Sequence, residues 1–406
     1  MPASSRRRAL LLSCAVAVAV ATNYTIQGPV LGFIEVEFGL SAAGAGTIAT
    51  AFFGASSVTM LAGGAIADRI GTRLAVTLGF LLVAIGNLGA GLLAPTFPAL
   101  LAWRVLGGLG SGFGFAAGAS YTRSIFEDRG RHLAQGLYGA SFLLGSGITL
   151  AYIPILAGPA GDWRLAFTLS ALAVAAVWVA WVVLAPGEPW APPATGGRAA
   201  LMVALRARNT WLLALCHMCG FGMAIVIGTW VTLYLADAFG EPLAAAGLIG
   251  SLTLITGIVA RASGGVILER AVDPVQLIRT GLALAIVGLT MLALAPNLPI
   301  AIAALVVTGV GVGLPYAAVF NGAAASARSS PASAQAVVGM GGLVTAIFGG
   351  PLVGLLFDAT GAFAISFLAL ATIIVAVLIL TALIRPFDLA ALDVVRAARE
   401  TPAPAP

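Results

Sequence analysis

The charged residues of this chain are almost confined to short segments between long apolar runs, and this pattern limits the possible fold most strongly. Of the 406 residues, 60% are hydrophobic and only 9% are charged, whereas about 25% are charged in a soluble globular protein. A helix of about 20 apolar residues crosses the hydrocarbon core of a bilayer. We therefore predict an all-α membrane protein with twelve transmembrane helices. The first predicted span ends near residue 34, and the others cover residues 42–66, 74–93, 97–122, 133–157, 163–184, 210–236, 242–267, 275–295, 298–323, 334–357 and 362–384.

A proline-rich stretch in the middle of the chain divides these spans into two sets of six. Residues 186–209 hold four prolines and three arginines and are partly amphipathic near 199–205. We interpret this stretch as a cytoplasmic linker that lies in part on the membrane surface. It separates an N-terminal set of spans in residues 1–185 from a C-terminal set in 210–385, and residues 386–406 form a cytoplasmic tail.

The arginines predict the orientation of the chain in the membrane. With the N-terminus inside, the arginines that lie between spans fall on the cytoplasmic side, except Arg164. This agrees with the positive-inside rule, so we expect both termini in the cytoplasm and the chain in the cytoplasmic (inner) membrane. The net charge of +5 then reflects membrane topology and does not indicate a nucleic-acid partner. Arg6–Arg8 and the apolar run after them resemble an export signal, which we expect to be retained as the first span.

A short charged turn after the second predicted span combines glycines with residues that cannot stay in hydrocarbon. It contains Gly64, Asp68, Arg69, Gly71 and Arg73, and burying such charges in the membrane costs a few kcal/mol each. Gly71 permits a tight reversal of the chain. We predict that these residues form a hinge that takes part in conformational change.

A weaker copy of this turn, with Gly265, Glu269 and Arg270, occurs after the second span of the C-terminal set. A charged turn repeated in the two halves of a membrane chain is typical of a duplicated transporter. The second copy lacks the glycine that follows the arginine in the first.

The first turn resembles the G-x-x-x-D-R-x-G-x-R signature of the major facilitator superfamily. Arg104–Gly110 is similar to the family's R-x-x-x-G-x-G pattern in the fourth helix, and Trp163–Phe167 to its W-R-x-x-F pattern at the sixth. The resemblance covers nearly the whole chain. It implies two six-helix bundles with pseudo-two-fold symmetry around a central cavity that opens alternately to each side of the membrane.

Two arginines lie inside predicted spans, and no acidic residue lies in the interior of any predicted span. Arg104 is in the fourth span and Arg261 in the eighth. Arginine stays protonated even when buried, so backbone carbonyls, water or an anionic ligand must offset its charge. Because a planar guanidinium suits a carboxylate or a small oxyanion, both arginines are candidate substrate contacts. A structural or gating role is the competing interpretation of Arg104.

Arg261–Gly265 resembles the R-x-x-G-G pattern of helix 8 in the oxalate/formate, monocarboxylate and nitrate/nitrite porters. The resemblance implies that Arg261 contacts a substrate anion. The second span has no arginine, so half of the paired-arginine site of the nitrate porters is absent. We therefore favour a small organic anion over nitrate.

Further polar or aromatic residues in apolar spans are candidate cavity residues, although packing or interfacial anchoring is an alternative for each. We also expect a break in the tenth span near Pro315, where a pathway needs irregular backbone. His217 is the histidine that could titrate in a span, with simple packing as its alternative. The candidates are Asn23, Tyr24, Gln27, His217, Trp230, Tyr316 and Asn321.

These features predict a secondary active transporter for a small organic anion that works by exchange or by proton-linked symport. A multidrug or metabolite exporter of the same fold is the alternative, and a non-transporting sensor or an enzyme is the least favoured. We find no nucleophile–base set, metal cluster or phosphate loop, so we expect no catalytic residues and no cofactor. Cys216 and Cys219 are interpreted as packing residues. The expected partners are the anionic substrate and the lipid bilayer, and the chain is expected to be a monomer.

Overall fold

The computed structural model describes residues 3–125, 131–187, 197–270, 272–327 and 331–387. All regular elements in this part of the chain are helical. For some helical residues the backbone is described without the side chain, and these are residues 3, 61–69, 120, 123–124, 131–133, 135–136, 197–200, 269 and 331–332.

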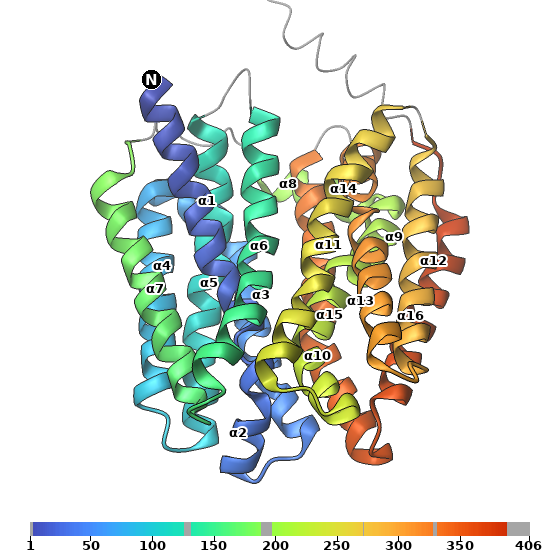
Figure 1. Ribbon diagram of the computed structural model, residues 1–406. Helices are drawn as coiled ribbons and strands as arrows, with labels where there is room; N and C mark the ends of the chain where they lie inside the picture. Colours follow the sequence, from blue (N-terminus) through green and yellow to red (C-terminus); the bar gives the residue numbers. More distant parts are fainter. Residues whose placement is uncertain (1–2, 126–130, 188–196, 271, 328–330, 388–406) are drawn as a thin grey trace, which may run out of the picture.

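The N-terminal half forms one bundle, coloured blue to green in Figure 1. The segment α1 to α2 is the first predicted span, and α3 to α7 are the next five. The elements are α1 (Ala3–Thr25), the 3₁₀ turn η1 (Gly28–Val30), α2 (Leu31–Phe38), α3 (Ala42–Ile70), α4 (Thr72–Leu92), α5 (Phe97–Ile125), α6 (Arg131–Ala157) and α7 (Trp163–Leu184).

The C-terminal half forms the second bundle, which stands beside the first in Figure 1. A linker helix, α8 (Gly197–Arg206), connects the two and covers the stretch predicted to be amphipathic. The elements of the second bundle are α9 (Arg208–His217), the π-helical turn η2 (Met218–Gly222), α10 (Met223–Phe239), α11 (Leu243–Glu269), α12 (Pro274–Ala293), α13 (Leu298–Gly313), α14 (Tyr316–Ser326), α15 (Pro331–Thr360), α16 (Phe363–Leu380) and the 3₁₀ turn η3 (Thr381–Leu383).

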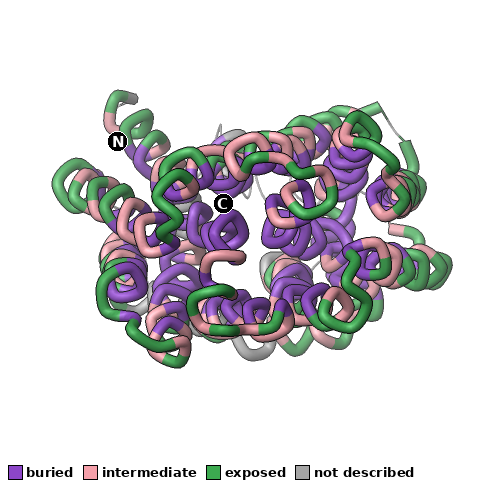
Figure 2. Tube along the Cα trace, turned by 60° about the horizontal axis from the view of Figure 1, so that its bottom comes forward, coloured by how far each residue is buried: buried purple, intermediate pink, exposed green. Residues whose placement is uncertain are grey.

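The helices account for the predicted spans. Eleven helical segments within the described residues are long and apolar enough to cross a membrane. The predicted span 42–66 falls in α3, whose 29 residues extend about 43 Å at 1.5 Å per residue. Figure 2 shows buried residues gathered where the helices face one another and exposed residues on the outward faces. The expected all-α membrane fold is confirmed.

Three of the predicted spans are not continuous α-helices. In the first span, α1 ends at Thr25 and the chain passes through η1 before α2 begins. In the seventh span, the π-helical turn separates α9 from α10. In the tenth span, α13 ends at Gly313 and α14 begins at Tyr316. Only this last break, at Pro315, was expected from the sequence, and α14 continues through Asn321 without a second one.

Close packing of α5 against its neighbours depends on glycine. A Cβ at Gly108 would overlap the carbonyl oxygen of Phe52, and one at Gly112 would overlap that of Ser56. The α3 backbone therefore lies directly on the glycine face of α5. Small residues allow this approach in a membrane, where van der Waals packing holds helices together.

Candidate functional site

Arg261 lies in α11, and no acidic residue of the described part of the chain pairs with its guanidinium group. The group makes no hydrogen bond and no ion pair within the described residues, and its Nε is buried without a partner. Its Cζ lies 4.3 Å from the centre of the Tyr316 ring and 5.9 Å from that of Phe221. The residue as a whole is half-buried. The guanidinium is thus held by aromatic rings and keeps its N–H donors unused.

These two rings belong to a larger group, which we call the interface cluster. In the C-terminal half, His217 stacks on Phe221 with 5.7 Å between ring centres and contacts Phe320 edge-on at 4.9 Å. Tyr316 lies 4.6 Å from Phe320. His217 is the last residue of α9, and Phe221 lies in the π-helical turn that follows. The two are four positions apart and so lie on one face of the helical segment. The members of the interface cluster are Tyr24, Phe142, His217, Phe221, Tyr316 and Phe320.

The interface cluster joins the two bundles. Phe221 lies 5.9 Å from Phe142 on α6 and 6.3 Å from Tyr24 on α1, between ring centres. Tyr24 and Phe142 contact each other edge-on at 4.6 Å. The interface cluster therefore contains side chains of both halves. A carrier that rocks its two bundles against each other binds its substrate at such an interface.

Arg104 occupies a different environment, inside the N-terminal bundle. It is 1% exposed, and its Nη2 donates to the carbonyl oxygen of Asn23 and to Oε1 of Gln27, both at 3.0 Å. Its Cζ lies 4.3 Å from the centre of the Phe52 ring. Asn23 also accepts a hydrogen bond from Asn87 on α4. Arg104 thus ties α5 to the end of α1, which favours the structural interpretation of this residue.

The two groups of residues are neighbours through Phe52. Its ring contacts the Arg104 guanidinium and also lies 5.3 Å from the ring of Tyr24. Tyr24 itself is fully buried, and its hydroxyl lies 3.5 Å from Oγ of Ser56. Of the sequence candidates, the structure therefore brings Arg261, His217, Tyr316 and Tyr24 together and places Arg104, Asn23 and Gln27 behind them.

Two further candidates lie outside the interface cluster. Trp230 on α10 is fully buried, and its ring lies 6.1 Å from that of Phe363 on α16. Its Nε1 has no hydrogen-bond partner within the described residues. Asn321 is exposed on α14 and makes no hydrogen bond there.

The first predicted hinge turn is built on Gly71. This residue has a φ of +88° and separates α3, which ends at Ile70, from α4, which begins at Thr72. Nη2 of Arg73 donates to the carbonyl oxygen of Val182 at 2.9 Å. Gly64, Asp68 and Arg69 lie in α3, and their side chains are outside the described residues.

The second copy turns differently because it lacks that glycine. Arg270 follows the last residue of α11 with a φ of −88°, and Asp273 caps α12 by accepting a hydrogen bond from the Val275 N–H at 3.1 Å. A Cβ at Gly265 would meet no atom within 4 Å. The side chain of Glu269 is outside the described residues.

The two bundles are in close contact at the end opposite the N-terminus, which we call the distal end (Figure 1). The Asp358 carboxylate at the end of α15 accepts the backbone N–H groups of Ala42 and Ala43 at 2.8 Å each. The N–H groups at the start of α3 have no partner within their own helix, and an acidic side chain caps them favourably. Oγ1 of Thr50 donates to the carbonyl oxygen of Ile347 at 2.6 Å.

Glycines complete the distal contact. A Cβ at Gly46 on α3 would lie 2.8 Å from the backbone of Gly350 on α15, and one at Gly28 would lie 2.6 Å from the carbonyl oxygen of Gly228. At both places the backbones of the two bundles touch, and no room is left between them for a side chain. These distal contacts could not be found by the sequence analysis, because they pair residues about 200 to 316 positions apart.

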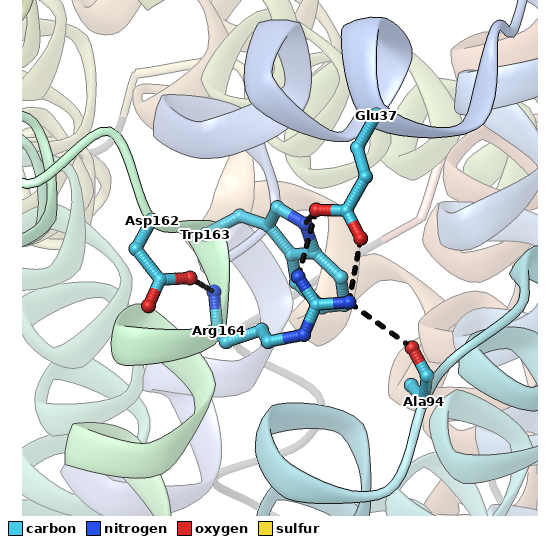
Figure 3. Close-up of polar contacts among 5 residues, drawn as sticks. All are labelled: Glu37, Ala94, Asp162, Trp163 and Arg164. Atoms are coloured by element: carbon cyan, nitrogen blue, oxygen red, sulfur yellow. Dashed lines mark hydrogen bonds and ion pairs between the residues drawn. The ribbon is translucent and has the colours of Figure 1, made fainter.

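An ion pair fastens the distal end of the N-terminal bundle (Figure 3). The Arg164 guanidinium donates to both oxygens of Glu37, at 2.7 and 2.5 Å, and Nε1 of Trp163 donates to the same carboxylate at 2.7 Å. Asp162 caps α7 by accepting the Arg164 N–H at 2.9 Å. Glu37 ends α2, so this pair ties the first span to the sixth and gives the W-R motif a local role.

Two helix bundles that meet around an arginine without an acidic partner among the described residues are typical of a membrane transport protein of the two-bundle class. The sequence model of the Major Facilitator Superfamily matches residues 13–332. The chain belongs to this superfamily of transporters and is a multi-pass membrane protein.

Curated relatives are carriers of anions by name. The chain is 29% identical over 252 residues to the probable nitrate/nitrite antiporter NarK1 of Thermus thermophilus, covering 58% of this chain and 55% of that protein. It is 25% identical over 273 residues to the probable sulfoacetate transporter SauU of Cupriavidus necator, covering 61% and 60%. The match thus spans only slightly more than half the length of these two relatives.

Solved structures share the fold over nearly the full chain. A bacterial homolog of the human lysosomal transporter Spinster, in an inward-facing and unoccupied conformation, superposes with a TM-score of 0.76 at 18% identity, covering 99% of this chain and all of that one. A D-xylose-proton symporter gives a TM-score of 0.77 at 12% identity, covering 93% of this chain and 97% of that one. At this identity the likeness concerns the fold alone.

Proposed function

We propose that this chain is a secondary active transporter that moves a small organic anion across the cytoplasmic membrane by alternating access. The observation that carries the proposal is the Arg261 guanidinium, which has no hydrogen-bond or ionic partner within the described residues and contacts Phe221, a ring that in turn contacts Phe142 of the N-terminal half. Arginine does not lose its proton in proteins. A bound anion would supply the missing negative charge and use the free N–H donors.

The position of Arg261 supports transport rather than static binding. Phe221 and Tyr316, which contact its guanidinium, belong to the C-terminal half, while Phe142 and Tyr24 of the N-terminal half contact the ring of Phe221. A site that both bundles share is exposed to either side as the bundles rock against each other. No carboxylate of the chain touches the interface cluster within the described residues, so coupling is by exchange or by a proton that the substrate carries.

The names of the relatives support an anionic substrate. The probable NarK1 antiporter is named for nitrate and nitrite and SauU for sulfoacetate. A third relative, the chloroplastic sodium-dependent phosphate transport protein 1 of Arabidopsis thaliana, is 24% identical over 259 residues, covering 59% of this chain and 50% of that protein. All of these substrates carry negative charge.

The proposal includes an orientation and a gating role for the charged turns. The N-terminal end of the bundles faces the cytoplasm, where the arginines between spans gather, and the distal end faces outward. The two charged turns after α3 and α11 act in gating, and the linker helix α8 lies on the cytoplasmic membrane surface. The transporter works as a monomer in the inner membrane.

Transport by proteoliposomes tests the proposal through Arg261. Arg261→Ala and Arg261→Lys should both abolish uptake of the anion, because an ammonium group does not reproduce the bidentate geometry of a guanidinium. Arg206→Ala is the matched control, since Arg206 is an exposed arginine at the end of the linker helix. Its uptake should equal that of the unmodified chain.

The same variants separate the alternative function. An exporter of neutral or cationic drugs should keep its activity in Arg261→Lys, and that result would overturn the anion proposal. The substrate is sought by thermal shift of the purified protein with monocarboxylates, dicarboxylates, nitrate and cationic drugs, because a ligand stabilises the folded state by mass action.

A further inference from the structure

We infer that the substrate of this site is a monoanion with an apolar body, such as a monocarboxylate or monosulfonate that carries an alkyl chain. A dianion or a compact inorganic oxyanion fits the site less well. This inference rests on the proposed function of Arg261 and adds the chemical class of its ligand. Three observations about the interface cluster carry it.

The first observation is the charge available in the interface cluster. Arg261 is the only arginine or lysine that contacts its rings within the described residues. The other intramembrane arginine, Arg104, donates through Nη2 to Asn23 and Gln27 and lies behind Phe52, where its Nε and Nη1 have no partner within the described residues. One cation balances one negative charge. A dianion would leave a second charge buried and unpaired, which is strongly unfavourable away from water.

The second observation is the geometry of the free donors. Cζ of Arg261 lies over the Tyr316 ring, 4.3 Å from its centre. The ring accepts no conventional hydrogen bond, so the N–H groups stay available to a carboxylate or sulfonate, which binds a guanidinium with two parallel hydrogen bonds. The buried Nε of Arg261 has no other partner. The head group of the ligand is therefore placed in the plane of the guanidinium.

The third observation is the apolar character of the side chains around the head group. The rings that contact the guanidinium are Tyr316 and Phe221, and Phe320 packs on Tyr316; Tyr316 and Phe320 are half-buried, so part of their carbon surface is free. Rings of this kind replace few of the hydrogen bonds that phosphate makes with water, and nitrate has no apolar body to pack against them. They do offer apolar contact to the body of an organic anion, which gains free energy as its surface leaves water.

The apolar rings around Arg261 favour an organic anion over the nitrate and phosphate for which two of the relatives are named. Phosphate is a compact, strongly hydrated ion, and a site for it needs several polar donors around its oxygens. Nitrate is weakly hydrated, but it has no apolar body that the rings could cover. In the interface cluster the hydroxyl of Tyr24 lies near Ser56, and that of Tyr316 would lie 3.8 Å from a Cβ at Gly139. Neither hydroxyl adds a positive charge, and the His217 imidazole is 6% exposed and packed between Phe221 and Phe320, so the guanidinium remains the anchor.

A chain-length series tests the inference on the purified full-length protein. The probes are acetate, propionate, butyrate and valerate, with succinate, nitrate and inorganic phosphate as competitors of the excluded classes. Affinity is measured by thermal shift and by inhibition of uptake in proteoliposomes. Each added methylene is expected to raise the affinity about fourfold, which corresponds to about 0.8 kcal/mol per buried CH₂. Arg261→Ala gives the baseline for partition of longer acids into the membrane.

A ring variant locates the effect in the interface cluster. Phe221→Ala should flatten the chain-length dependence to less than about twofold per methylene while acetate still binds. Phe348→Ala is the control, because Phe348 is an aromatic residue on α15 that is 67% exposed. It should leave the dependence unchanged. If Phe221→Ala does not fold, the series on the unmodified protein still decides the question.

The outcomes separate this inference from the proposed function. Affinity that rises with chain length and depends on Arg261 supports both. Tighter binding of succinate, nitrate or phosphate than of butyrate would overturn the substrate class and leave the anion transporter intact. A protein that binds none of these anions would overturn the proposed function itself, and the inference with it.

Discussion

Removing the Asp358 carboxylate should open the distal end of the molecule. This side chain reaches from α15 across to the other bundle and accepts the N–H groups of Ala42 and Ala43 at 2.8 Å each. The contact exists only while the two bundles meet at the distal end. Asp358→Ala therefore removes stabilisation from the distally closed state and removes little from a distally open one.

The size of the effect follows from the chemistry of the helix start. A side chain that caps a helix N-terminus contributes about 0.5–2 kcal/mol, and a negative charge at that position contributes about 0.3–1 kcal/mol. Asp358 is exposed, so water and salt weaken both contributions, and we take about 1 kcal/mol in total. A shift of that size changes the ratio of closed to open molecules about fivefold.

Electron–electron distance measurements between spin labels would detect this change. Ala160→Cys and Leu294→Cys place one label on the distal end of each bundle, at exposed positions, in a background without the three native cysteines. The ratio of molecules with a long distance to molecules with a short one should rise about fivefold in Asp358→Ala. Asp237→Ala is the control, because Asp237 is an exposed acid at the same end that makes no hydrogen bond within the described residues.

Two results would refute this reasoning. If Asp358→Ala leaves the distance distribution unchanged while the protein stays folded, the cap does not hold the bundles together. If Asp237→Ala shifts the distribution equally, the effect comes from net charge at the distal end. Lowering the salt concentration should enlarge the effect of Asp358→Ala, since exposed charges are screened less.

Three further perturbations test other contacts. Glu37→Gln breaks the ion pair with Arg164. Because these side chains are 38% and 32% exposed, the unfolding free energy should fall by about 1 kcal/mol or less. Thermal unfolding at low and high NaCl checks this, and a loss of stability that does not shrink with salt would contradict it. Gly46→Ala should lower the stability of the contact between the bundles by about 1–3 kcal/mol and slow uptake, because its Cβ would lie 2.8 Å from the backbone of α15. Gly54→Ala on the same helix is the control, since its Cβ meets no atom within 4 Å, and it should change neither quantity. Arg104→Lys should lower the unfolding free energy by about 1–3 kcal/mol without altering the order of anion affinities, and a changed order would place this residue in the binding site.

Much of the fold could be predicted because its signals are local. The spans follow from runs of apolar residues, and the break at Pro315 follows from a proline that cannot donate a backbone hydrogen bond. The break after Thr25 was missed because Gly28 and Pro29 lie in an otherwise apolar run. What fixes it is contact with another span, since a Cβ at Gly28 would lie 2.6 Å from the carbonyl oxygen of Gly228. The π-helical turn likewise has no signature of its own in the residues.

The candidate site could be predicted only in part. Arg261 was found because an intramembrane charge is costly and stands out among apolar residues. Its contact Phe221 was not found, because a phenylalanine in a span is expected to pack against lipid or core. Arg104 was recognised, but its partners Asn23 and Gln27 lie more than 70 positions away. Long-range pairings of this kind depend on the packing of whole helices.

The glycines at the distal end have a consequence for how easily the two bundles part and meet again. Where Gly46 faces Gly350 and Gly28 faces Gly228, backbone touches backbone. Separation there uncovers peptide groups, which water solvates well, and little hydrocarbon. No rotamers must rearrange on reclosure. Such a surface releases and re-forms with a small energetic barrier, so the speed of the transport cycle would be governed by the larger side chains around the guanidinium.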